Sequence, residues 1–275
     1  MVTESFRSAL ELLRTPAAWL PGIASGFFCA SFIFLQFFSG IFIAERLWIL
    51  EMLVFPFFVA GLMHLVKTGE RSLSAFISGG TGKYFRVLLP SLIIFFWLIL
   101  TLILLFIPLA LLGVAETAFV FVVMSTSFTV LLFTFFYDAA AIIEERKVFD
   151  AIRRSAEFVL QQTRACMVFY LIALAIFFSA FFLTLLTWTA ALYERLEPLA
   201  TMSAVEIQSF SPSRFNELLG YDGILVTAFL AFIAVTMAVS LIYSFKACFF
   251  RDHAGTPAAV TLQGEYDEKG RWFKY

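Results

Sequence analysis

The run at positions 87–115, VLLPSLIIFFWLILTLILLFIPLALLGVA, contains no charged residue. The hydrocarbon core of a bilayer is about 30 Å thick, and one helical crossing needs roughly 20 apolar residues. An uncharged run of this length predicts a transmembrane helix. This one stretch already sets the class of the whole chain.

Five further runs meet the same length, so the chain is predicted to cross a membrane six times. Hydrophobic residues make up 61% of the sequence and charged residues 14%, whereas a soluble domain is about half apolar and a quarter charged. The sequence therefore predicts an all-α integral membrane protein, with a six-span domain over 1–253 and a polar cytoplasmic tail over 254–275. The six predicted spans are 19–44, 47–66, 87–115, 118–137, 166–192 and 223–245.

Lys and Arg residues are distributed unequally between the two sides of these spans. The N-terminal segment, the 67–86 and 138–165 loops and the C-terminal segment hold 16 of the 19, and the opposite side holds three. Cytoplasmic loops are the ones enriched in Lys and Arg. Both termini are therefore predicted to be cytoplasmic, and the expected location is the plasma membrane.

The predicted spans form three hairpins. Glu45-Arg46 is expected to join the first two spans and Glu116-Thr117 the third and fourth, and such short connections require antiparallel neighbours. The long outer loop, 193–222, is predicted to contain a short helix with Ser211 as its cap and Gly220 at its end. In the tail, 267–270 is a candidate hairpin turn.

A cytoplasmic segment with one apolar and one charged face precedes each hairpin. These segments are 3–14, 72–84 and 149–163, and glycines interrupt the second one. Each is predicted to be an amphipathic helix lying in the membrane interface. The apolar faces of the first and third segments consist of Phe6, Ala9, Leu10, Leu13, Phe149, Ile152, Ala156, Val159 and Leu160.

The most distinctive segment is DAAAIIEE at 138–145, followed by AIRRSAEF at 151–158. Together with LLRTP at 12–16, WLP at 19–21 and the exit from the last span at 243–252, it resembles the glycerophosphoryl diester phosphodiesterase membrane-domain superfamily. The resemblance implies a six-helix integral domain, usually of undetermined activity. Some members of that family are fused to a phosphodiesterase. No such domain is recognised in these 275 residues, so no catalytic residue is implied.

Glu51 is the only carboxylate predicted to lie well inside a span, about 6 Å from its outer boundary by helical rise. Intramembrane carboxylates often face a cavity or a transport path. The alternative is that Glu51 is structural, and hydrogen-bonds a neighbouring helix or pairs with an arginine. Pro56 is expected to kink the same span, and Ser125, Thr126 and Thr129 give span four its hydroxyl groups. These five residues form the candidate intramembrane polar site.

A second group of candidates lies in the 138–165 loop. Arg153 and Arg154 could contact anionic lipid headgroups, each basic residue contributing about 1 kcal/mol. Alternatively, these arginines form an internal charge network with Asp138, Glu144 and Glu145. The five acids of this loop match its five bases, which favours the internal network.

Gly22, Gly26 and Ala30 form a stripe of small residues on span one. Such stripes allow two helix backbones to approach closely. The contact could be with another span, which we favour, or with a protein partner. The aromatic residues of the cytoplasmic tail are a second candidate contact for a protein partner, and membrane lipids are the other expected partner.

Several kinds of chemistry have no support in the sequence. His64 and His253 lack metal-binding spacing, and GGTGKY at 79–84 does not fit a phosphate-binding loop. No hydrolase or redox motif occurs, and a net charge of −1 gives no basic surface for nucleic acid. We expect no cofactor, no metal and no catalytic residue.

The first expectation for function is accordingly a non-enzymatic membrane scaffold or accessory subunit. The alternative is a transporter of small molecules or lipids, or a lipid-handling protein, that uses Glu51 and the kinked second span. An intramembrane enzyme is a third and weaker alternative, because no nucleophile–base pair can be named.

Overall fold

The computed structural model describes residues 2–38, 41–111, 113, 116–200, 202, 211–255, 264–266 and 272–274. Six helical segments of this part are long and apolar enough to cross a membrane, which confirms the predicted multi-pass all-α class. The described elements are α1 (Val2–Leu12), a 3-10 helix η1 (Pro16–Trp19), α2 (Leu20–Phe38), α3 (Ile41–Thr68), α4 (Leu73–Leu111), α5 (Glu116–Thr134), α6 (Tyr137–Ile143), α7 (Val148–Gln161), α8 (Thr163–Ala191), α9 (Tyr193–Ala200), α11 (Pro212–Ala254), β1 (Gly264–Tyr266) and β2 (Trp272–Lys274).

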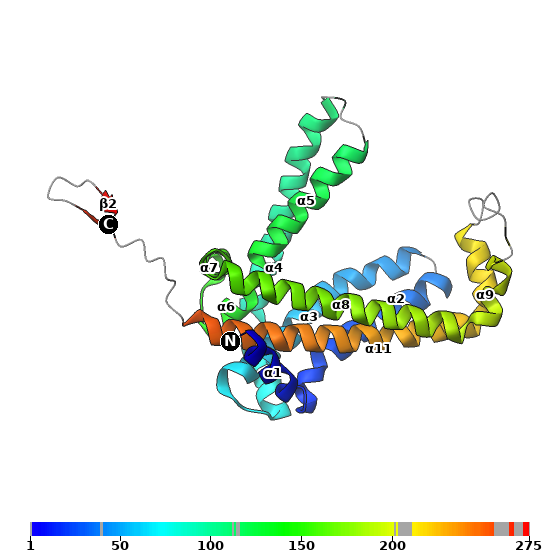
Figure 1. Cartoon of the computed structure of the whole chain (residues 1–275), viewed down its shortest axis with the longest axis horizontal. Coiled ribbons are helices and arrows are strands. Elements are labelled where there is room, and N and C mark those ends of the chain that lie inside the picture. The colour runs from blue at the N-terminus through cyan, green and yellow to red at the C-terminus, as the bar shows by residue number, and fades with distance from the viewer. Residues whose placement is uncertain are drawn as a thin grey trace.

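Helices α2, α3, α8 and α11 run side by side and form the main body of the molecule (Figure 1). The closest packing is between α2 and α11. A Cβ atom on Gly22 would lie 2.1 Å from Ser240 Oγ and 2.2 Å from Thr236 O, and one on Gly26 would lie 2.4 Å from Thr236 Oγ1. The small-residue stripe therefore packs against another span of the same chain, which was the favoured alternative.

Helix α4 crosses α3 at a second close contact. A Cβ atom on Gly79 would lie 2.4 Å from the His64 Cβ, and one on Gly80 would lie 2.6 Å from the Phe57 ring. The prediction that 72–84 is a separate, interrupted helix is therefore wrong: Gly79 and Gly80 allow the close crossing with α3 and do not break the helix. It forms the first turns of a continuous helix that runs from Leu73 to Leu111.

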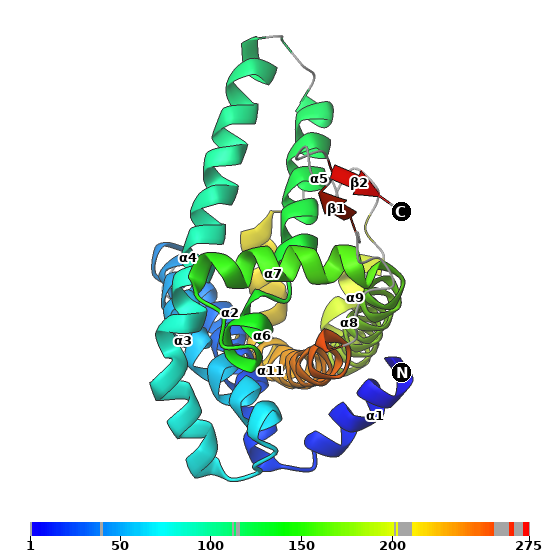
Figure 2. The same cartoon turned by 90° about the vertical axis from the view of Figure 1, so that its left-hand side faces the viewer.

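The α4–α5 hairpin leans away from the other four long helices (Figures 1 and 2). Only 6% of the most apolar stretch of α4 is buried, and the same share holds for the stretch that includes α5. By comparison, 44% of the corresponding stretch of α3 is buried. The outer part of this hairpin therefore offers its apolar side chains to the surroundings rather than to the body.

The main core lies where α1, α6 and α7 gather around the ends of α3, α4, α8 and α11. Its largest members are phenylalanines that are at most 1% exposed. The rings of Phe136 and Phe158 are 5.0 Å apart, and those of Phe169 and Phe245 are 4.6 Å apart. Such aromatic pairs add about 0.5–1.5 kcal/mol each to the effect of burial. The full set is Phe76, Phe136, Phe158, Phe169, Phe245, Phe249 and Phe250.

Two predicted hairpin connections are displaced in the structure. Glu45 and Arg46 lie inside α3, because α2 already ends at Phe38 and α3 begins at Ile41. Glu116 opens α5, after α4 has ended at Leu111. Apolar residues flank both breaks, so hydropathy does not mark where the helix stops; the local signals are the pair Ser39-Gly40 in the sequence and Gly113, whose φ is 64°.

The amphipathic segments before spans one and five form α1 and α7, and their buried faces agree with the prediction in part. Ala9, Ile152 and Val159 are buried as predicted, but Leu10 is 47% exposed, Phe149 67% and Leu160 65%. The buried row also includes the small residues Ser5, Ala151 and Ser155, which were not predicted to face the core. Small side chains allow these short helices to lie close to the body, which leaves the larger apolar residues on the outside.

The short helix predicted in the outer loop is present as the first turns of α11. Ser211 Oγ accepts the backbone N–H of Arg214 at 3.3 Å, and Gly220, with φ 61°, interrupts the helical conformation. Pro212 occupies the first turn. In the tail, β1 and β2 pair in antiparallel register, while the predicted turn at 267–270 lies outside the described residues.

Candidate functional site

An ion pair lies inside the helical body, between α6 and α11. Lys246 Nζ donates a hydrogen bond to Asp138 Oδ2 at 2.7 Å, and both side chains are 2% exposed. The other carboxylate oxygen of Asp138 accepts the backbone N–H of Ala139 at 2.7 Å. Two buried charges are tolerated only when they pair well and find further hydrogen bonds. Removing either partner would leave an isolated charge in the interior.

Aromatic rings surround the ammonium group of Lys246. Its Nζ lies 4.2 Å from the centre of the Phe135 ring and 4.8 Å from that of Tyr243. The electron-rich faces of these rings attract the cation. The sequence places Asp138 in a loop and gives no reason to single out Lys246. The one available signal is that each residue directly follows a long apolar run.

Arg154 joins α7 to two other parts of the chain. Its Nε lies 3.0 Å from both carboxylate oxygens of Glu144, and its NH2 donates to Ala254 O at 3.0 Å. Arg153 points outward and forms only an exposed pair with Glu157 at 3.2 Å. The structure therefore brings Glu144 and Arg154 together as an internal pair and leaves Arg153 at the surface.

Ser155 follows these arginines and is fully buried. Its Oγ donates a hydrogen bond to Phe133 O at 2.8 Å and accepts the backbone N–H of Phe136 at 3.0 Å. Both backbone groups lie at the break between α5 and α6, where the regular helical hydrogen bonds are interrupted. The Ser155 hydroxyl thus satisfies buried polar groups that would otherwise lack a partner.

Glu145 belongs to a separate cluster at the end of α3. Lys67 Nζ donates a hydrogen bond to Glu145 Oε1, and this contact, together with the positive charges of Lys83 and Arg86, lowers the pKa of Glu145 below 4.5. Asp138, Glu144 and Glu145 are therefore not one network. Each contacts a different basic residue.

The predicted intramembrane polar site is split between distant parts of the structure. Glu51 accepts a hydrogen bond from Ser25 Oγ at 2.8 Å, so it joins α3 to α2. Pro56 lies within α3, which continues as one helix to Thr68. The third part of the set, Ser125, Thr126 and Thr129, lies on α5, which leans away from the body (Figure 1), and Thr129 Oγ1 bonds only to Ser125 O in its own helix.

The two histidines are engaged in separate contacts. His64 Nδ1 lies 3.1 Å from Lys83 Nζ, and His253 Nδ1 lies 2.9 Å from Phe249 O. Within the described ranges, no three His, Cys, Asp or Glu residues are grouped so that they could hold a metal ion. His64 adjoins the Lys67–Glu145 cluster through Lys83, whereas His253 contacts its own helix.

An apolar groove of about 700 Å³ lies between α1, α8 and α11. Arg14 and Trp19 lie on the α1–η1 side of it, and the indole N–H of Trp19 is fixed by a hydrogen bond to Leu13 O at 2.7 Å. Nothing in the sequence pattern marks this groove, because three helices far apart in the chain form it. Its walls are otherwise lined by small and aliphatic residues: Leu10, Leu13, Ile172, Ala175, Ile176, Ser179, Ala180, Leu183, Met237, Ala238 and Leu241.

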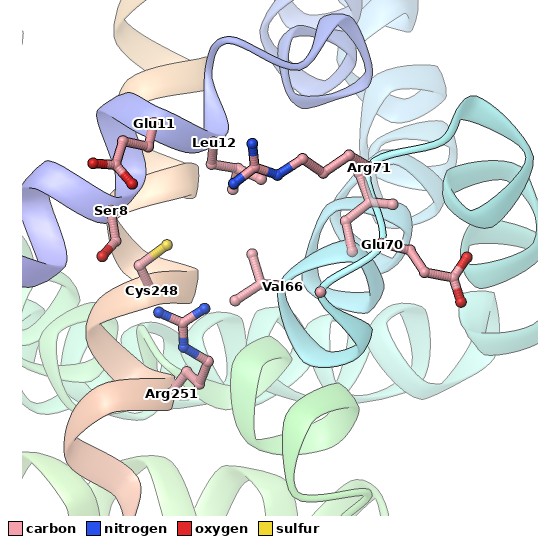
Figure 3. A pocket seen from close by; sticks show the side chains of 10 residues that line it. Ser8, Glu11, Leu12, Val66, Glu70, Arg71, Cys248 and Arg251 are labelled. Carbon is pink, nitrogen blue, oxygen red and sulfur yellow. The ribbon is translucent and has the colours of Figure 1, made fainter.

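A smaller, polar pocket of about 210 Å³ lies on another face of α1, against the α3–α4 connection and α11. Figure 3 shows Arg71 reaching into it from the connection and Arg251 from α11, with the thiol of Cys248 between them. The carboxylate of Glu70 points away from the pocket (Figure 3). The pocket thus contains two guanidinium groups, whereas the groove is almost entirely apolar.

Comparison with known proteins finds no matching family model, no matching curated protein and no matching solved structure. The family resemblance described above therefore rests on the sequence segments quoted for it. In the structure, Asp138, Arg154 and Ser155 of those segments all make contacts within the chain.

Proposed function

We propose that this protein is a lipid-handling integral membrane protein, and that its α1–α8–α11 groove holds one acyl chain of an anionic phospholipid. The observation that carries the proposal is the pairing of an apolar groove with a cation, Arg14, on the α1 side. Arg14 is exposed and, among the described residues, has no ion-pair partner.

The dimensions of the groove fit one leaflet of a bilayer. Its lining on α8 runs from Ile172 to Leu183, which is about 16 Å by helical rise. Half of a hydrocarbon core is about 15 Å. An acyl chain lying along this groove would extend from the membrane interface to the midplane.

Helix α1 covers the N-terminal part of α8, because Phe6 packs on Phe245 and Phe245 packs on Phe169. The Arg14 end of the groove is therefore the end at which α8 begins. With both termini in the cytoplasm, as the Lys and Arg distribution indicates, this end meets the inner leaflet of the plasma membrane. Anionic lipids concentrate there, and each basic residue near that surface contributes about 1 kcal/mol of attraction.

We propose that the whole chain is oriented with both termini on the cytoplasmic side of the membrane. Six spans arranged as three hairpins, with α1 and α7 in the cytoplasmic interface, agree with the exposed apolar side chains Leu10, Phe149 and Leu160 on these two helices. The resemblance to the phosphodiesterase membrane-domain superfamily supports a six-helix integral domain and implies no catalytic residue. We assign no chemical step to any residue.

A second candidate function is a membrane scaffold or accessory subunit. It is favoured by the α4–α5 hairpin, because both of its helices present apolar side chains on nearly all sides. A second membrane protein could pack against this hairpin, and the cytoplasmic tail offers a further contact. The transport alternative based on Glu51 has less support, because Glu51 contacts Ser25 and does not line the groove.

The proposed lipid binding can be tested with substitutions that fill the groove with a large side chain. Ala175→Trp and Ala238→Trp place a large side chain in its walls, and Leu174→Trp places the same side chain on the opposite, outward face of α8. Native mass spectrometry of each variant, extracted in mild detergent from its own membrane, counts the lipids that stay bound. We expect the two groove variants to lose an anionic phospholipid that the wild-type protein and Leu174→Trp retain.

The outcomes separate the two candidate functions. Equal lipid retention in all four proteins would contradict the groove as a lipid site. A stoichiometric second polypeptide, retained by wild type and by the groove variants alike, would favour the scaffold. Truncation of residues 260–275 then tests whether the tail holds that partner.

A further inference from the structure

We infer that the polar pocket between α1, the α3–α4 connection and α11 binds a phosphate group. Arg71 and Arg251 reach into it from different walls (Figure 3), and Ser8 adds a hydroxyl group from α1. The planar guanidinium group binds phosphate oxygens through paired N–H···O hydrogen bonds, which are among the stronger polar contacts in proteins. The volume of about 210 Å³ suits a phosphate ion or a small monoester, and is below the range of most organic-ligand pockets.

The acids that line this pocket leave Arg71 available. Glu11 pairs with Arg7 at 3.5 Å, on the outer side of α1, and the carboxylate of Glu70 points away from the pocket. Within the described part of the chain, Arg71 has no carboxylate in ion-pair contact. Its guanidinium donors therefore face an open volume.

Arg251 is held in place by the neighbouring Asp252. Its Nε and NH2 lie 2.9 and 2.8 Å from Asp252 Oδ1, and Asp252 Oδ2 accepts a hydrogen bond from Ser5 Oγ at 2.7 Å. This arrangement leaves NH1 of Arg251 for a ligand and fixes the orientation of the group. A donor that is already oriented loses less conformational freedom when the ligand binds.

The pocket and the groove lie on different faces of α1. The pocket uses Ser8, Glu11 and Leu12, and the groove uses Leu10, Leu13 and Arg14. The phosphate site therefore stands independently of the proposed lipid groove. A phosphate group can reach it from the aqueous phase, as free phosphate, or from the membrane, as the headgroup of a phosphatidic acid.

The first experiment uses inorganic phosphate and the full-length protein in dodecylmaltoside, which contains no phosphorus. The ³¹P resonance of phosphate should broaden on adding the wild-type protein. Arg71→Gln should weaken the apparent affinity roughly tenfold, because one charge-assisted interaction is lost. Arg153→Gln removes an arginine that is 73% exposed and lies outside the pocket, so its broadening should match that of wild type.

The second experiment tests the lipid source. Wild type, Arg71→Gln and Arg14→Gln are placed in nanodiscs that contain phosphatidylcholine and phosphatidic acid, and the phosphatidic acid retained by each is counted by native mass spectrometry. Phosphatidic acid lost with Arg71→Gln, whether or not Arg14→Gln loses a further molecule from the groove, would identify the lipid headgroup as the ligand of the pocket.

Either an Arg71-dependent phosphate resonance or Arg71-dependent lipid retention supports the inference and names the source of the phosphate. If neither measurement depends on Arg71, the inference is overturned. Loss of lipid in Arg14→Gln alone would support the groove and would count against the pocket as the lipid site.

Discussion

Separating Asp138 from Lys246 should destabilise the protein more than any surface change. The two groups are 2.7 Å apart and 2% exposed, so each substitution leaves the other charge buried without its partner. Asp138→Asn leaves the ammonium group against the Phe135 and Tyr243 rings, which still attract it. Lys246→Met leaves the carboxylate with only the N–H of Ala139.

The expected losses of stability differ because the Phe135 and Tyr243 rings still attract the unpaired ammonium group, whereas the unpaired carboxylate keeps one hydrogen bond. Breaking a buried pair costs about 3–5 kcal/mol, so we expect about 3 kcal/mol for Asp138→Asn and about 4 kcal/mol for Lys246→Met. The double variant contains no buried charge at this point. It should cost no more than either single variant, about 2–3 kcal/mol rather than the sum of about 7, which is a coupling of about 4–5 kcal/mol.

The assay is reversible unfolding by SDS of the protein in dodecylmaltoside, followed by tryptophan fluorescence. The exposed pair Arg153–Glu157, at 3.2 Å, supplies the control cycle, and a helical surface pair of this kind is worth only about 0.3–0.5 kcal/mol. Additive effects of Asp138→Asn and Lys246→Met, or a coupling no larger than that of the control, would mean that the two buried charges do not depend on each other.

Three further changes have expected outcomes in the same assay. Gly22→Ala should cost about 1–3 kcal/mol because its Cβ meets α11 at 2.1 Å, whereas Gly82→Ala, with open space around it, should be neutral or slightly stabilising; equal effects would contradict the α2–α11 packing. Ser155→Ala should cost about 1–3 kcal/mol, since it leaves two buried backbone groups without a partner, and a neutral result would mean that they find another. The pair with Lys67 lowers the pKa of Glu145, so the ionised carboxylate stabilises the fold above pH 4.5 and this contribution disappears as the pH falls through the folded-state pKa. An acid titration of stability should therefore show wild type and Glu145→Gln converging below pH 4.5, and a constant difference would contradict the pair.

The number of spans and the outer-loop helix can be predicted from the sequence because local signals specify them. Each span is a run long enough to cross the bilayer, and Ser211 and Gly220 mark the limits of the short helix by their capping chemistry. After Phe38 the signal is only the pair Ser39-Gly40, and a prediction from hydropathy over about 20 residues passes over it because both flanks are apolar. For this reason the predicted connection at Glu45-Arg46 was wrong.

The buried ion pair and the groove could not be predicted in the same way. Asp138 and Lys246 are 108 positions apart, and only the packing of α6 against α11 brings them together. The groove depends on where α1 lies against α8 and α11, which periodicity within one helix does not determine. The hydroxyl groups of span four were grouped with Glu51 into one polar site by residue type alone, and the direction of α5, which the sequence does not specify, separates them from Glu51.

Trp19 offers the most direct measurement of the proposed groove, because it lies in the groove wall. A variant that keeps only this tryptophan, with the other four replaced by Phe, is placed in bilayers with brominated phosphatidic acid or brominated phosphatidylcholine, both of which quench indole fluorescence on contact. A matched variant that keeps only Trp97, which is 56% exposed on α4, reports on the bulk lipid.

If the groove selects an anionic phospholipid, phosphatidic acid should quench Trp19 at a lower mole fraction than phosphatidylcholine, Arg14→Gln should abolish this preference, and Trp97 should show no preference. Equal quenching of Trp19 by the two lipids, or a preference that persists in Arg14→Gln, would contradict a groove that selects an anionic phospholipid.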